Sequence, residues 1–253
     1  MNRTKRIIAA LDIENGMVSK GTQFNNVKNL GNPVDFAKKY EAEGIDELVL
    51  LDINASNQNR KVGKELVKAI VQEISIPLTV GGGLKSVADI VELIENGANK
   101  VFVNSAAVEN PNLISEAVKI LGSSKIVIAI DTKKDLSTSE YFVYVHGGAN
   151  KVEINVIDWA KECEMLGAGE LLVTSIDTDG MRSGYDLELI RKICENVKIP
   201  VIASGGAGNS KDFYDVFKAG ADAALAASIF HFGIYTPLIL KRELKEMGIN
   251  VRI

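Results

Sequence analysis

Short apolar segments alternate with longer amphipathic segments along the whole chain. Most of the short segments are rich in Val, Ile and Leu and end at Asp, Gly or Ser, a pattern typical of buried strands. They cover residues 6–12, 47–53, 77–82, 100–105, 125–131, 170–177, 200–206 and 223–228. The segments between them repeat apolar residues with a helical period and predict helices at 33–44, 63–74, 87–97, 113–121, 156–167, 186–197, 211–220 and 236–248.

Eight strands that alternate with eight helices predict an α/β protein with a parallel sheet, and eight is the number that closes as a (β/α)₈ TIM barrel. A doubly wound open sheet is the alternative, although it rarely needs eight strict repeats in 253 residues. Residues 76–107 also align without a gap with residues 199–230. The sequence therefore predicts a single barrel domain, 1–253, built from two repeated half-barrels, about 1–122 and 123–253.

Composition excludes several classes of function. The formal net charge is −4 with both signs mixed along the chain, so nucleic acid is not an expected partner. No apolar stretch approaches the roughly 20 residues of a membrane span, and the N-terminus reads as a first strand, not a signal peptide. Cys163 and Cys194 fall in helical patterns as free thiols, which fits a cytoplasmic protein and predicts no zinc site.

Glycine and small polar residues gather where strands end, the face on which barrels of this type carry their active sites. The segments are "VGGG" (80–83), "VNSAA" (103–107), "SGGAG" (204–208) and "AASIF" (226–230). Glycines there let backbone N–H groups approach an anion, although tight turns alone would also use them. Because the two pairs of segments match in the repeat, we predict two phosphate sites on opposite sides of the barrel mouth.

Four of the predicted strands have an aspartate at or next to their last residue. Asp12 and Asp131 occupy matching positions in the two halves and are candidates for an acid and a base, with helix capping as the alternative. Asp52 and Asp177 also match, and could bind substrate hydroxyls or loop backbone. Asp179 is interpreted as a turn residue. The two histidines do not lie near these acids in a ligand-like spacing, so the sequence predicts no metal and no cofactor.

Several blocks together resemble one known family. They include "KRIIAALDIENGMVSKGTQF", "DELVLLDINAS", "GAGELLVTSIDTDG", "IPVIASGGAG" and "ADAALAASIFHFG". The chain is similar over essentially its whole length to the cyclase subunit of imidazole glycerol phosphate synthase. The sister isomerase of histidine synthesis shares the half-barrel design but lacks the last of these blocks.

The resemblance implies an ammonia-dependent cyclase and lyase of histidine biosynthesis. Its substrate would be a bis-phosphate, a ribulosyl aminoimidazole carboxamide ribotide, and its products imidazole glycerol phosphate and aminoimidazole carboxamide ribotide. Asp12 and Asp131 occupy the positions of the family's acid/base pair. The predicted substrate- and phosphate-binding residues are Lys20, Asp52, Gly82, Gly83, Asn104, Ser105, Thr174, Asp177, Gly180, Ser204, Gly205, Gly206, Ala227 and Ser228.

The resemblance also implies a partner, a glutaminase subunit that docks on the opposite barrel face as a heterodimer and supplies ammonia. The positions of the family's charged ammonia gate are Arg6, Glu47, Lys100 and Glu170. Two stretches depart from the family pattern, "HGGANKVEIN" and "DTDGM". The alternative is therefore a paralogous barrel that conducts ammonia for amidation of a surface-polysaccharide sugar. Such paralogues tend to lose the first catalytic Asp, which this chain retains as Asp12.

Overall fold

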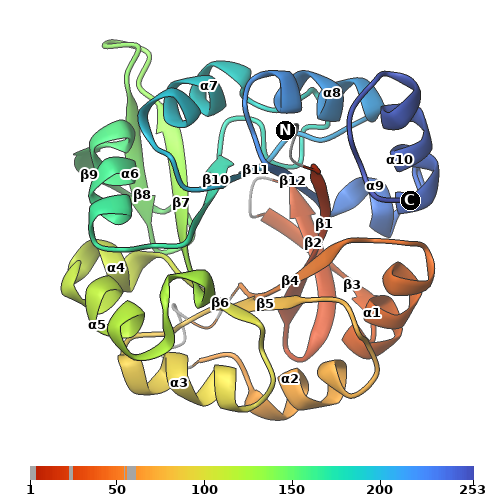
Figure 1. Cartoon of the computed structure of the whole chain (residues 1–253), viewed down its shortest axis with the longest axis horizontal. Coiled ribbons are helices and arrows are strands. Elements are labelled where there is room, and N and C mark those ends of the chain that lie inside the picture. Colours follow the sequence, from red (N-terminus) through yellow and green to blue (C-terminus); the bar gives the residue numbers. More distant parts are fainter. Residues whose placement is uncertain (1–3, 23–24, 54, 56–60) are drawn as a thin grey trace.

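In the computed structural model, which describes residues 4–22, 25–53, 55 and 61–253, eight parallel strands close into a barrel (Figure 1). Each barrel strand pairs with the next barrel strand along the chain, and the last, β12, pairs with the first, β1, to close the ring. The prediction of a (β/α)₈ barrel is confirmed. The barrel strands are β1 (Arg6–Glu14), β4 (Glu47–Asp52), β5 (Leu78–Gly81), β6 (Lys100–Val103), β7 (Ile126–Lys134), β10 (Glu170–Ser175), β11 (Val201–Ser204) and β12 (Ala223–Ala226).

Helices surround the barrel on its outside (Figure 1). The longer ones are α1 (Pro33–Ala42), α2 (Lys64–Val71), α3 (Val87–Glu95), α5 (Asn112–Leu121), α6 (Val156–Met165), α7 (Leu187–Asn196), α8 (Ser210–Lys218) and α10 (Pro237–Glu246). Shorter ones are α4 (Ser105–Glu109), α9 (Ser228–His231) and the 3₁₀ turn η1 (Ser123–Lys125). None of the helices in the described part of the chain has the length and apolar character needed to cross a membrane.

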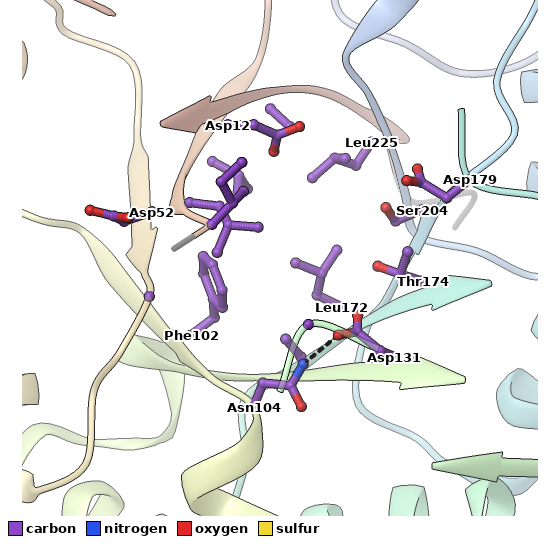
Figure 2. A pocket seen from close by; sticks show the side chains of 18 of the residues that line it. Asp12, Asp52, Phe102, Asn104, Asp131, Leu172, Thr174, Asp179, Ser204 and Leu225 are labelled. Atoms are coloured by element: carbon purple, nitrogen blue, oxygen red, sulfur yellow. Dashed lines mark hydrogen bonds between the residues drawn. The ribbon is translucent and has the colours of Figure 1, made fainter. Parts of the chain in front are cut away.

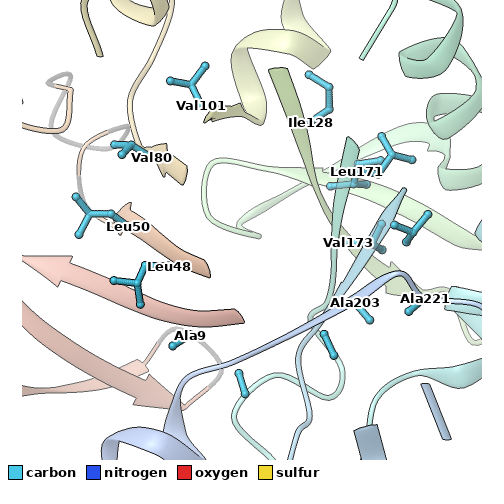
Figure 3. Close-up of a cluster of buried hydrophobic side chains, with 14 of the residues drawn as sticks. Ala9, Leu48, Leu50, Val80, Val101, Ile128, Leu171, Val173, Ala203 and Ala221 are labelled. Carbon is cyan, nitrogen blue, oxygen red and sulfur yellow. The ribbon is translucent and has the colours of Figure 1, made fainter. Parts of the chain in front are cut away.

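The strands bury both of their faces, because side chains alternate between the two sides of a strand. One face packs against the helices, as Leu48, Leu50 and Val101 do (Figure 3). The other face fills the barrel interior with a separate apolar cluster that includes Ile8 and Phe102. Burial on both sides explains why these strands read as continuous apolar runs in the sequence.

Two hairpins extend the sheet beyond the barrel and were not predicted as strands. β2 (Met17–Thr22) pairs antiparallel with β1 and with β3 (Asn25–Gly31). β8 (Tyr141–Val145) pairs antiparallel with β7 and with β9 (Asn150–Asn155). β3 and β9 are largely polar and lack the apolar run that identified the barrel strands.

Candidate active site

A cavity of about 440 Å³ opens at the carboxyl ends of the barrel strands. This volume lies within the range of small-molecule sites, roughly 300–1,000 Å³. Most of the predicted site residues line it: Asp12, Asp52, Gly82, Gly83, Asn104, Ser105, Asp131, Thr174, Gly180, Ser204, Gly205, Gly206, Ala227 and Ser228. The structure thus brings together in one cavity side chains that lie more than 200 residues apart along the chain.

Asp12 and Asp131 face this cavity from opposite sides (Figure 2). Asp12 lies on β1 and Asp131 on β7, and four strand positions separate these two strands in the closed ring of eight. The apolar side chains of Phe102, Leu172 and Leu225 lie around the cavity between them. A ligand that fills the cavity would therefore meet one carboxylate on each side.

The environment of Asp131 favours its protonated form. Burial raises the pKa of this carboxyl, and the like charge of Asp179 raises it further. A hydrogen bond from Asn104 Nδ2 to Asp131 Oδ2, 2.9 Å long, acts in the opposite direction, and the resulting pKa is about 6 (Figure 2). A carboxyl with a pKa near the working pH can both donate and accept a proton, as acid–base catalysis requires.

Glycines at matching positions allow close packing of backbone at two sides of the cavity. Gly82, after β5, has φ +122°, and a Cβ atom there would lie 2.7 Å from the carbonyl oxygen of Asp52. Gly205, after β11, has φ +90°, and its Cβ atom would lie 2.7 Å from the carbonyl oxygen of Ser175. Larger residues are excluded at both positions by sterics and by backbone conformation. Main chain therefore lines the cavity wall at both turns.

The two acids that follow β10 have different positions. Asp177 is exposed and does not line the cavity; its Oδ2 accepts a hydrogen bond of 3.0 Å from the backbone N–H of Lys134. Asp179, interpreted from the sequence as a turn residue, lines the cavity, and its negative charge contributes to the raised pKa of Asp131. The turn explains this difference, because Asp179 N–H donates to Ser175 O and brings Asp179 back over the barrel mouth.

The four predicted gate residues form a closed ring of ion pairs at the amino ends of the strands. Arg6 contacts both Glu47, at 2.7 Å, and Glu170. Lys100 contacts the same two carboxylates, at 3.4 Å and 2.9 Å respectively. Burial by itself would lower the pKa of Arg6, but the charges of Glu170 and Glu47 outweigh it and the pKa is raised. The guanidinium of Arg6 therefore stays charged at neutral pH.

Comparison with known proteins agrees with this geometry. A family model described as histidine biosynthesis protein matches residues 6–236, which is most of the chain. The chain belongs to this family. It is 61% identical over 250 residues to imidazole glycerol phosphate synthase subunit HisF of Petrotoga mobilis, covering 99% of each chain. The proteins of the same name from Thermococcus onnurineus (57%, covering 98% of each chain) and Leuconostoc mesenteroides (51%, covering 100% of each) are also similar.

Sequence reasoning missed several residues of this family member's cavity. Besides Asp179, the ionisable side chains that were not predicted to line it are Lys85, Glu109, His146 and Arg182. They lie in loops, in the short helix α4 or in the second hairpin, where no strand end indicated that they would reach the cavity. Lys20 lies in β2, and its side chain is outside the described part of the structure. Among the described residues, no group of three or more His, Cys, Asp or Glu could hold a metal ion.

Proposed function

We propose that this chain is the cyclase subunit of an imidazole glycerol phosphate synthase and acts in histidine biosynthesis. The observation that carries the proposal is the single cavity in which Asp12 and Asp131 face each other, with glycine turns at both sides. The relatives that are 51–61% identical over nearly their whole length bear the name of that enzyme. Their high identity makes the same chemistry the expected one here.

The substrate is a ribulosyl aminoimidazole carboxamide ribotide with a phosphate at each end. One phosphate would bind at the turn after β5 and at the start of α4, near Gly82, Gly83 and Ser105. The other would bind across the mouth, at the turns after β11 and β12: Ser204, Gly205, Gly206, Ala227 and Ser228. Backbone N–H groups suit phosphate oxygens, and the two anchors would hold the reactive middle of the substrate between the carboxylates.

Asp12 and Asp131 would move the protons of the reaction. Ammonia adds to the ketone carbon of the substrate, and loss of the ketone oxygen as water requires a proton donor. Ring closure and release of aminoimidazole carboxamide ribotide then require proton removal and a second donation. With a pKa of about 6, Asp131 can act as proton donor or proton acceptor near neutral pH. Burial and the charge of Asp179 raise its pKa to this value. Asp52, Thr174, Gly180 and Asp179 would contact the groups between the phosphates.

Ammonia would arrive from a glutaminase subunit on the opposite face of the barrel. The ring of Arg6, Glu47, Lys100 and Glu170 would form its entrance. Above the ring, the barrel interior is lined by apolar side chains such as Ile8, Val49 and Ala129, through which neutral ammonia passes more readily than ammonium. We further propose that the chain is one domain made of two half-barrels, about 1–122 and 123–253.

The isolated chain, incubated with the ribulosyl substrate and an ammonium salt, tests this function. Imidazole glycerol phosphate and aminoimidazole carboxamide ribotide should form in equal amounts without a glutaminase, because external ammonia reaches the cavity from its open mouth. Product is detected by mass spectrometry. A folded chain that yields neither product would refute the cyclase assignment and favour a role in ammonia conduction alone.

A further inference from the structure

The turn of the second hairpin closes one side of the cavity mouth. It joins β8 to β9 and contributes His146, Gly147 and Ala149 to the cavity wall. His146 faces α4 through two contacts. Its backbone N–H donates to Ser105 Oγ at 2.8 Å, and its side-chain Nε2 lies 3.2 Å from Glu109 Oε1. The turn is therefore attached to the residue that we assign to one substrate phosphate.

The contact with Ser105 leaves that hydroxyl suited to a phosphate. Since Ser105 Oγ accepts a hydrogen bond from His146 N–H, its own proton can be donated to a phosphate oxygen. His146 has φ +55° and is followed by Gly147 at +66° and Gly148 at +78°, so three successive residues adopt the left-handed conformation. This conformation costs a non-glycine residue about 1 kcal/mol. Histidine is among the non-glycine residues that adopt this conformation more often than most, so the turn tolerates it and directs its side chain to the cavity mouth.

The charges around the cavity indicate what the imidazole does there. The described residues that line it include five carboxylates and two side chains with a permanent positive charge: Asp12, Asp52, Glu109, Asp131 and Asp179 against Lys85 and Arg182. A bis-phosphate brings further negative charge into this cavity. Glu109 lies next to Ser105, where it would repel an incoming phosphate unless its charge is compensated. His146 is placed to compensate it.

We propose that His146 is a phosphate-binding and specificity-determining residue of the β5–β6 side of the mouth, an inference that rests on the proposed function. Before substrate binds, Nε2 of the imidazole contacts Oε1 of Glu109. When the phosphate occupies Gly82, Gly83 and Ser105, the imidazole turns to it and donates a hydrogen bond. The His146 side chain is 41% exposed, which leaves it room for this movement. The hairpin turn thereby selects substrates that carry a phosphate at this end.

Binding of the two reaction products separates the two ends of the substrate, because each product carries one phosphate. We would measure the affinities of imidazole glycerol phosphate and of aminoimidazole carboxamide ribotide by calorimetry. His146→Gln should weaken the affinity for one product about fivefold, the effect of a partly exposed hydrogen bond to a phosphate, and leave the affinity for the other unchanged. The unchanged product also shows that the variant is folded.

Glu109→Gln distinguishes phosphate binding from a merely structural contact. If His146 binds phosphate, removal of the competing carboxylate should increase the affinity for that same product by about two- to fivefold. If the His146–Glu109 pair only holds the turn in place, both variants break it and both should weaken binding alike. Equal weakening in the two variants would overturn the proposal, as would a His146→Gln variant with unchanged affinity for both products.

Lys151→Gln is the matched control. It removes a positive charge from the same hairpin, but Lys151 pairs with Asp135 and Glu153 and does not line the cavity. The affinities for both products should stay unchanged. A loss of affinity comparable to that of His146→Gln would show that any loss of positive charge from this hairpin weakens binding, and would overturn the proposal. A wild-type chain that binds neither product would refute the proposed function itself, whereas wild-type binding with an insensitive His146 refutes only this inference.

Discussion

The two ends of the barrel use charged residues in opposite ways. At the amino ends of the strands, Arg6 and Lys100 alternate with Glu47 and Glu170, and each cation contacts both carboxylates. At the carboxyl ends, Asp131 is held by the neutral amide of Asn104 and faces a second carboxylate, Asp179. The first arrangement is balanced, with two cations and two carboxylates in contact. In the second, burial and the like charge of Asp179 raise the pKa of Asp131, so this carboxyl can exchange its proton near neutral pH.

The largest expected effect concerns the cavity carboxylates. Asp12→Asn and Asp131→Asn should each slow single-turnover product formation with saturating ammonium by about 10²–10⁴-fold, because each removes a group to which we assign proton transfer. The measurement is quenched-flow turnover of the ribulosyl substrate. Lys211→Asn is the control, since Lys211 pairs with Asp215 on the outer surface of α8. Activity within tenfold of wild type in Asp131→Asn would contradict its assignment.

The second prediction concerns the balanced ring. Arg6→Met should lower the free energy of unfolding by about 2–3 kcal/mol, because it leaves two largely buried carboxylates sharing only Lys100. The side chain of Arg6 is 23% exposed, which keeps the expected loss below that of a fully buried pair. Urea unfolding followed by circular dichroism measures it. A loss no greater than that of the surface variant Lys211→Met would show that the ring contributes nothing to stability.

The third prediction has the opposite sign and depends on pH. The pKa of Asp131 is raised in the folded state to about 6, so the folded chain binds this proton more tightly than the unfolded chain. Protonated Asp131 therefore contributes to the free energy of unfolding of the wild type at low pH. This contribution is lost as the pH rises from about 4 through about 6. Asp131→Asn should match wild type below about pH 4 and exceed it by about 1–3 kcal/mol at pH 7. Equal stability at both pH values would contradict the raised pKa.

The smallest expected effect is a change in the pKa of Asp131 itself. The hydrogen bond from Asn104 lowers this pKa, while burial and Asp179 raise it. Asn104→Ala should therefore raise the pKa above about 6, and Asp179→Asn should lower it. Carbon-13 NMR of labelled aspartate follows both changes. Shifts in the same direction for the two variants would show that the balance at this end is set by other groups.

The fold and the family were predictable from sequence, and both predictions are confirmed. Strands buried on both faces give continuous apolar runs, and their order along the chain is their order in the barrel. The cavity mouth was less predictable, because its outer residues lie in loops and hairpins. Asp177 and Asp179 illustrate the reason. They are only two residues apart, but the turn between them places Asp179, and not Asp177, in the cavity wall. The pattern of apolar residues does not predict that turn.

The difference between the two ends can be tested by feeding ammonia in two ways. Lys100→Met and Asp131→Asn would be assayed in complex with the proposed glutaminase partner, once with glutamine and once with an ammonium salt. Asp131→Asn should lose turnover with both sources, whereas Lys100→Met should lose efficiency with glutamine and keep turnover with ammonium. If Lys100→Met lost turnover equally with both sources, or if Asp131→Asn remained active with ammonium, the division of roles between the two ends would be wrong.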